Sequence, residues 1–286
     1  MYDECEHALI VRRAGAPRLA IVFSGIGQRM QGVGPLEFLK ASGLEDSNFV
    51  FLRDLRRTGF AYGCSAAIPT FDALLGWLQT AVASFSRVED ILAIGVSSGA
   101  LPSMAAAEFL DARCSIVFGP RFQAMKEVAA IFGRRDRAVI DNAALFERGA
   151  DVRLRLRDRI QTASHTALEA VRQRFGMPPR EWSPAPLLEA GVQDSAPFFK
   201  HLRTDGSTRH HLFYIPSNMR DRGCVKALTD RALRVIAHPV EPPTGYPRTR
   251  FRWDHDVVPI LIAAGSLNHV IASAIEDSPC TTVPLP

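Results

Sequence analysis

The sequence has little of what marks disulfide-rich or metal-binding proteins. It holds only five cysteines in 286 residues, an odd number, and they are widely scattered. No pair has the CxxC spacing and no Cys/His cluster has the spacing of a zinc site. The sequence therefore predicts neither a disulfide framework nor a metal site, and we expect no cofactor.

The chain also lacks a signal-peptide pattern and any long hydrophobic run. Its start, "MYDECEHALIVRRAG", is acidic and then basic, without the apolar stretch that a signal peptide contains. No segment approaches the roughly 20 apolar residues of a membrane-spanning helix. These absences predict a cytoplasmic protein without a membrane span.

An excess of one charge is likewise missing, because the formal net charge is only +4. The arginines are nevertheless concentrated in mid-chain, in "GRRDR" (Gly133–Arg137) and "VRLRLRDR" (Val152–Arg159). This pattern fits a solvated face, or a surface that receives an anionic substrate or partner. Because no aromatic-interleaved basic motif or helix-turn-helix pattern accompanies the charge, we do not expect nucleic acid as a partner.

Apolar residues are abundant, at 47% of the chain, and many gather in short runs that are typical of buried strands. Helix-compatible stretches lie between most of these runs. Alternating strands and helices predict an α/β fold, with a mostly parallel sheet of about six strands and helices on both faces. The six runs are Leu19–Gly25, Phe49–Asp54, Ile91–Val96, Ser115–Gly119, His211–Ser217 and Leu233–Val240.

Four stretches have the pattern of helices. "TFDALLGWLQTAVASF" begins with Thr70 as a plausible N-cap, and Pro102 in "SGALPSMAAAEFLDA" is accepted only near a helix start. "RDRGCVKALTDRA" and "DVVPILIAAGSLNHVIASAI" are expected to be the last two helices. The segment 121–209 contains no convincing core strand and is too apolar for a disordered linker. We expect it to form a helical lid or cap inserted into a core made of 1–120 and 210–286.

One short motif indicates chemistry. Gly95-x-Ser97-x-Gly99 follows an apolar strand and opens an alanine-rich helix. That strand–turn–helix context is what a nucleophile elbow requires, because the residues two before and two after the serine must be small where strand and helix cross. The motif therefore predicts an exposed nucleophilic hydroxyl on Ser97.

With this motif and this order of elements, the chain resembles the α/β-hydrolase superfamily. The resemblance implies a catalytic triad in the chain order Ser, Asp or Glu, His, with the acid and the histidine on loops after the last strands. Asp221 is the expected acid, with Asn218 as the alternative because it stands nearer the strand end; the competing interpretation of Asp221 is a helix cap. His255, just before the last helical stretch, is the expected base.

Two other histidines fit the base position less well. His238 lies inside an apolar strand, which is typical of a core residue, and His269 falls too far into the final helix. The resemblance also implies an oxyanion hole with one donor from Ser98 and a second from Gly25 or Ile26, in the loop after the first strong strand. The same loop does not fit a dinucleotide-binding turn, because Met30 stands where the third glycine belongs.

Taken together, these residues predict a serine enzyme that transfers acyl groups, hydrolysing an ester, thioester or amide. An acyltransferase with the same triad, and a catalytically silent scaffold that acts as a binding module, remain alternatives. Arg121, which directly follows a strand end, is the expected contact for an anionic substrate, either a small molecule or an acyl-carrier-type donor. The acyl group, the acceptor and the oligomeric state are left open.

Overall fold

The computed structural model describes residues 2–25, 27–56, 58–121, 196–230, 233–242 and 256–276. All of them belong to one compact unit, Met1–Ala124 with Val192–Pro286. The remaining residues include Ile26 and His255, which the sequence places in the candidate site. The expected lid lies mostly outside the described residues as well, so its existence stays a prediction.

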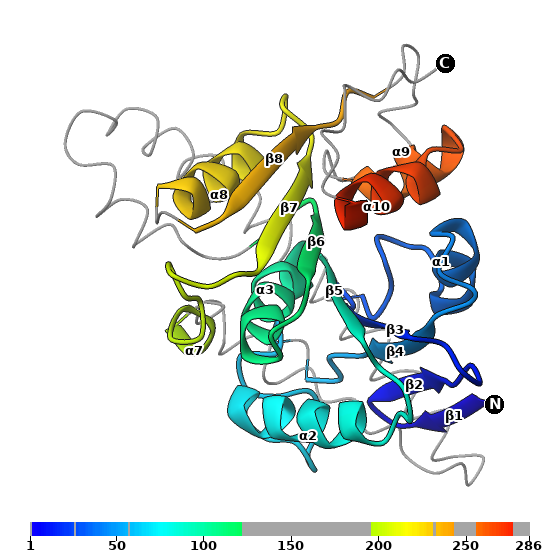
Figure 1. Ribbon diagram of the computed structural model, residues 1–286. Coiled ribbons are helices and arrows are strands. Elements are labelled where there is room, and N and C mark those ends of the chain that lie inside the picture. Colours follow the sequence, from blue (N-terminus) through cyan, green and yellow to red (C-terminus); the bar gives the residue numbers. More distant parts are fainter. Residues whose placement is uncertain are drawn as a thin grey trace, which may run out of the picture. The chain divides into compact units, whose positions relative to one another are not determined.

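A single mixed sheet organises the described residues, in the order β1-β2-β4-β3-β5-β6-β7-β8 (Figure 1). The strands from β4 to β8 in that order are parallel, whereas β1 and β2 pair antiparallel with each other and β2 pairs antiparallel with β4. All six expected strands are confirmed. They are β3 (Arg18–Phe23), β4 (Asn48–Leu52), β5 (Asp90–Val96), β6 (Cys114–Phe118), β7 (Arg209–Tyr214) and β8 (Val235–Pro239).

The expected number of about six strands was too low, because the described sheet has eight. The additional strands are β1 (Tyr2–Cys5) and β2 (Ala8–Val11), which form a short hairpin at the edge. β1 is largely polar, and the apolar run of β2, ALIV, has only four residues, the lower limit of the runs by which a buried strand is recognised.

Helices lie on both sides of the sheet, as expected. Their bounds are α1 (Pro35–Ala41), α2 (Phe71–Ala83), α3 (Ala100–Phe109), α7 (Ala196–Phe199), α8 (Met219–Thr229), α9 (Val257–Ala263) and α10 (Leu267–Glu276). The Thr70 hydroxyl accepts a hydrogen bond from the Ala73 amide at 3.1 Å and so caps α2, as the sequence indicates. Pro102 lies in the first turn of α3.

The last apolar stretch is not one helix. It divides into α9 and α10 at Gly265, whose φ of +65° is in the left-handed region where only glycine is unstrained. No single helix among the described residues has the length and apolar composition to cross a membrane. Together, α9 and α10 have the length and apolar composition of such a helix, but the axes of the two helices are bent by 110° from each other.

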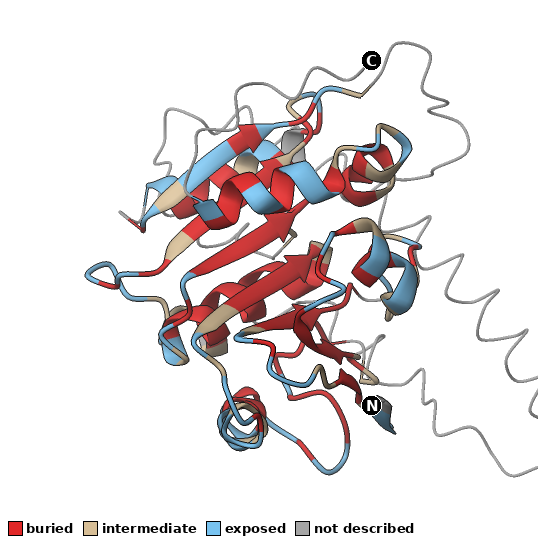
Figure 2. Ribbon diagram, turned by 45° about the vertical axis from the view of Figure 1, so that its right-hand side comes forward, coloured by how far each residue is buried: buried red, intermediate tan, exposed pale blue. Residues whose placement is uncertain are grey.

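The core consists of two apolar layers, one on each face of the sheet. Leu92 and Ile94 of β5 pack with α1, α9 and α10, while Ala93 between them contacts Ala107 of α3 on the opposite face. Figure 2 shows the central strands buried along their lengths. Both faces of the central strands are covered, and in open α/β sheets ligands bind beyond the carboxyl ends of the strands.

The short helix α7 returns the chain to the core. Phe198 is fully buried, with its ring 4.7 Å from that of Phe71 at the start of α2. Lys200 and His201 both contact the Asp72 carboxylate. The hydrogen bond from Lys200 contributes most to lowering the pKa of Asp72, and the hydrogen bond from His201 lowers it further. An aromatic contact and an ion pair thus attach this segment to α2.

Two histidines stack between neighbouring strands at the β8 edge. The Nδ1 atom of His211 lies 3.1 Å from Nε2 of His238, and the His238 ring is 4.4 Å from the ring of Phe213. His238 is only 8% exposed, which confirms the sequence interpretation of this residue as part of the core. Burial lowers the pKa of His238, because the charged imidazolium is poorly solvated there.

This burial predicts a stability that falls in weak acid. The pKa of His238 is lower in the folded than in the unfolded chain, so the unfolded chain binds more protons as the pH drops below about 6.5. The free energy of unfolding should therefore be highest above that pH and decrease below it, until the folded-state pKa is reached. Urea denaturation of wild type and His238→Phe at pH 7.5 and 5.5 measures the effect.

The difference between the two pH values should be smaller in His238→Phe than in the wild type. His269→Phe is the matched control, because His269 is exposed on α10 and should leave the difference unchanged. An equal pH effect in wild type and His238→Phe would contradict the assignment.

Candidate active site

Ser97 stands at a sharp turn between β5 and α3. Val96 is still extended, with φ −128° and ψ 135°, and the next three residues, Ser97–Gly99, form one turn of 3₁₀ helix that leads into α3. Ser97 has a φ of +54°, in the left-handed region that residues other than glycine rarely adopt. The expected strand–turn–helix geometry around the serine is thus present.

The two glycines of the motif are required by the closeness of the crossing. A Cβ atom on Gly95 would lie 2.2 Å from Oγ of Ser103 and 2.3 Å from the carbonyl oxygen of Gly99. A Cβ on Gly99 would lie 2.5 Å from the carbonyl oxygen of Phe23. Non-bonded atoms cannot approach so closely, so the backbone at both positions tolerates no side chain.

The surroundings hold the turn in place from two sides. The carbonyl oxygen of Ser97 accepts a hydrogen bond from the Arg121 amide at 3.0 Å, which connects the end of β6 to the turn. On the other side, a Cβ on Gly25 would be 3.6 Å from Cβ of Ser97, so the loop after β3 passes directly beside the serine. Ser97 itself is partly exposed, whereas Ser98 and Gly99 are buried.

The expected oxyanion-hole residues differ in what their amides do. Ser98 is in the first turn of the helical segment, where backbone amides point toward the amino end of the helix. The Gly25 amide donates to the Arg29 carbonyl oxygen at 3.1 Å, so it is occupied within its own loop. Ile26, the other expected donor, lies outside the described residues. Gly25 thus shapes the loop beside Ser97, while the amides of Ser98 and Ile26 are the candidate donors.

Six of the eight histidines are described, and none of these six hydrogen-bonds to the Ser97 hydroxyl. The other two, His165 and His255, lie outside the described residues. His255 immediately precedes Asp256, a buried residue at the start of α9. The amide of Val258 in the first turn of α9 donates to Oε1 of Gln31 at 2.8 Å, which attaches this turn to the loop after β3.

The two candidate acids have different positions in α8. Asn218 precedes the helix, and its Oδ1 accepts a hydrogen bond from the Asp221 amide at 3.2 Å, so Asn218 caps α8. Asp221 lies inside the first turn and is fully buried. The alternative in which Asp221 is the cap is therefore wrong, and Asp221 is a buried carboxylate beyond the carboxyl end of β7.

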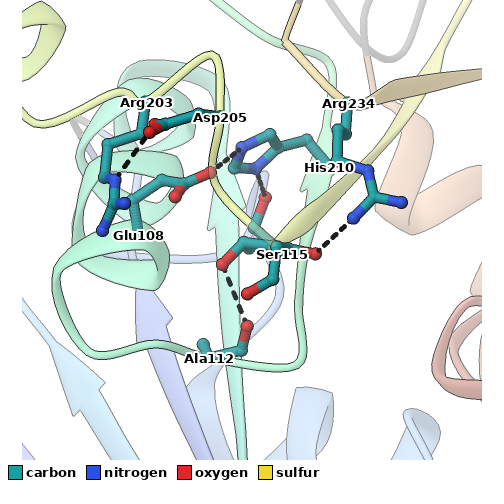
Figure 3. A network of polar contacts seen from close by, with 9 residues as sticks. Glu108, Ala112, Ser115, Arg203, Asp205, His210 and Arg234 are labelled. Carbon is teal, nitrogen blue, oxygen red and sulfur yellow. Dashed lines mark hydrogen bonds and ion pairs between the residues drawn. The ribbon is translucent and has the colours of Figure 1, made fainter.

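A second constellation of serine, histidine and acid, which sequence reasoning missed, lies inside the protein (Figure 3). Both ring nitrogens of His210 form hydrogen bonds. Its Nδ1 lies 2.8 Å from Oγ of Ser115, and its Nε2 lies 3.0 Å from Oε1 of Glu108. Ser115 and His210 are fully buried and Glu108 is 5% exposed. No substrate can reach this hydroxyl, so the network is structural.

The only sequence signal for this network was the placement of its residues. Ser115 and His210 are each the second residue of a strand, and they face each other in the register of β6 and β7. They lie toward the amino ends of these strands, whereas Ser97 follows the carboxyl end of β5. Among the described residues no group of three or more His, Cys, Asp or Glu side chains is arranged to hold a metal ion.

No protein-family model matches the chain, and no curated protein is significantly similar to it in sequence. Several solved structures are similar in backbone. The capsule O-acetyltransferase of Neisseria meningitidis serogroup A has 10% identity and a TM-score of 0.49, over 96% of this chain and 94% of the other. Carboxylesterase CesB from Bacillus subtilis has 11% identity and a TM-score of 0.49, over 96% and 90%.

The Glycosylation Associate Protein (Gap123) complex from Streptococcus agalactiae is similar over 94% of this chain, with 12% identity and a TM-score of 0.42. This chain spans only 46% of that one, which is less than half of its length. Similarities this remote carry neither an activity nor the role of a residue. The function therefore has to be argued from the geometry around Ser97.

The close crossing predicts that small additions at either glycine disrupt the fold. Gly95→Ala and Gly99→Ala should each lower the free energy of unfolding by about 3 kcal/mol, because the new methyl group overlaps backbone oxygens. Gly27→Ala is the matched control, since a Cβ at Gly27 would meet no atom within 4 Å. Urea denaturation measures all three, and equal stability of the three variants would refute the proposed packing.

The left-handed backbone at Ser97 predicts that two variants without the hydroxyl differ in stability. Ser97→Gly should be about 1 kcal/mol more stable than Ser97→Ala, because both lack the hydroxyl but only glycine relaxes the strained φ. Thermal unfolding of the two variants side by side measures this difference. If Ser97→Ala were as stable as Ser97→Gly, the turn would not be strained.

Proposed function

We propose that the chain is an acyl-transfer enzyme of the α/β-hydrolase type, in which Ser97 is the nucleophile and an ester, thioester or amide is hydrolysed. The strained, partly exposed position of Ser97 at the crossing of β5 and α3 carries this proposal. Strain of this kind persists only where surrounding packing imposes it, and it is concentrated at functional sites. Here it holds the hydroxyl at the carboxyl edge of the sheet, at the start of a helix.

The proposed reaction has two steps. Oγ of Ser97 attacks the substrate carbonyl carbon while His255 takes the hydroxyl proton, and the amides of Ser98 and Ile26 stabilise the oxyanion. His255 then gives the proton to the leaving group, which departs and leaves an acyl-enzyme. Water attacks this ester with His255 again as base, which releases the acid and restores Ser97.

The proposed base is His255, because of its place in the chain next to α9. The described histidines show no hydrogen bond to Ser97, and His255 and His165 lie outside the described residues. His255 comes just before α9, whose first turn is attached through Val258 and Gln31 to the loop that passes beside Ser97. This attachment supports His255 over His165.

Asp221 is the proposed partner of the base. Asp221 is a buried carboxylate beyond the carboxyl end of β7, and a carboxylate can orient an imidazole and stabilise it once it is protonated. Asn218 carries no charge and its side-chain oxygen is used in capping α8. Asp221 also stands between Ser97 and His255 in the chain, which is the order that the family resemblance implies.

Acyl transfer to another acceptor is the second candidate. The acyl-enzyme formed on Ser97 is common to both reactions, and an alcohol or amine in place of water would make the protein an acyltransferase. The partial exposure of Ser97 permits either acceptor. Product analysis with and without an added alcohol separates the two activities.

Covalent labelling tests the nucleophile directly. An alkyl fluorophosphonate should add one phosphonyl group to wild type and to Ser98→Ala but none to Ser97→Ala, as measured by intact-protein mass spectrometry. His255→Ala and Asp221→Asn should slow the labelling by about 10²-fold or more, because the hydroxyl is no longer activated. His165→Ala should label at the wild-type rate.

One outcome would decide against the proposed activity, and another would decide against the proposed base alone. A wild-type protein that takes no label, although it is folded by circular dichroism, would leave the catalytically silent scaffold as the better explanation. A normal rate in His255→Ala together with a slow rate in His165→Ala would retain the nucleophile and change the base.

A further inference from the structure

The backbone of Arg121 is hydrogen-bonded to the backbone of Ser97, the proposed nucleophile. Its amide donates to the carbonyl oxygen of Ser97 at 3.0 Å. The approach is set by the two preceding residues, because Gly119 has a φ of +53° and donates to the Phe213 carbonyl oxygen at 2.8 Å, and Pro120 has a fixed φ. The backbone of Arg121 therefore lies directly beside that of Ser97.

The side chain of Arg121 is not a solvated surface arginine. Its Nε atom is buried, and the residue as a whole is only partly exposed. By contrast, Arg29 on the neighbouring loop is exposed, and its Nη1 donates to the Gly32 carbonyl oxygen at 3.3 Å within its own loop. Of these two arginines beside the site, Arg121 is the one partly withdrawn from water.

We propose that Arg121 selects substrates that carry an anionic group, a carboxylate or a phosphate, close to the bond that Ser97 attacks. This inference rests on the proposed function and names its substrate class. A guanidinium presents planar, paired donors that match the oxygens of a carboxylate or phosphate. Partial burial strengthens this attraction, because water screens the charge less. A substrate with a neutral group at the same place would leave the guanidinium without this gain.

A pair of probes tests the selectivity apart from the chemistry. Both are fluorophosphonates with an alkyl chain of equal length, ending in a methyl group in one and in a carboxylate in the other. The rate of phosphonylation of Ser97 is measured for each, and their ratio is the selectivity. The carboxylate is placed on the phosphonyl arm in one set and on the alkoxy arm in another, which distinguishes an anionic acyl group from an anionic leaving group or acceptor.

Arg121→Gln should lower the ratio of carboxylate to methyl probe at least tenfold in one of the two sets. Arg121→Lys, which keeps the charge but not the paired donors, should restore part of it. Arg87→Gln is the matched control for charge, since Arg87 is exposed and precedes the amino end of β5, roughly 23 Å of strand away from Ser97. Its ratio should equal that of the wild type.

The outcomes separate the two proposals. Labelling of Ser97 with an unchanged ratio in Arg121→Gln, in both sets, would overturn the inference on Arg121 and leave the acyl-transfer proposal intact. Absence of labelling by all probes in the wild type would overturn the acyl-transfer proposal, and the inference with it. An equal loss of rate for both probes in Arg121→Gln, without recovery in Arg121→Lys, would assign Arg121 a purely structural role and also overturn the inference.

Discussion

The crossing of β5 and α3 leaves no space for a side chain at Gly95 or Gly99, two residues before and after Ser97, and the arrangement of the site depends on this contact. The carbonyl oxygens of Phe23 and Ser24 lie against Gly99, so the same contact fixes the loop that follows β3. Ser97 lies between these two crowded positions and has a φ of +54°, a strained conformation of the kind that surrounding packing maintains.

Position in the sheet, rather than hydrogen-bond geometry, separates a candidate nucleophile from an inert hydroxyl. Ser115 has a histidine and a carboxylate in series at good distances, yet it is sealed between β6, β7 and α3. Ser97 lacks such partners among the described residues but stands at the edge where parallel strands end. Helix amides point at that edge and solvent can reach it.

The sequence predicts those parts of the molecule that are local in the chain. The six predicted strands coincide with short, mostly apolar runs, although β8 at the sheet edge is largely exposed, and the motif around Ser97 spans five residues, so both were recognised. The break at Gly265 was missed because apolar residues continue on both sides of it. The pairing of Ser115 with His210 and the engagement of the Gly25 amide depend on register and loop conformation, which composition and spacing do not encode.

The hydrogen bond from Val258 to Gln31 joins positions that are 227 residues apart. During translation the loop after β3 leaves the ribosome early, but its partner follows only after nearly the whole polypeptide has been made. A nascent chain therefore carries the serine long before the two segments can meet. The contact between the loop beside Ser97 and the start of α9 can therefore form only after synthesis has passed Val258.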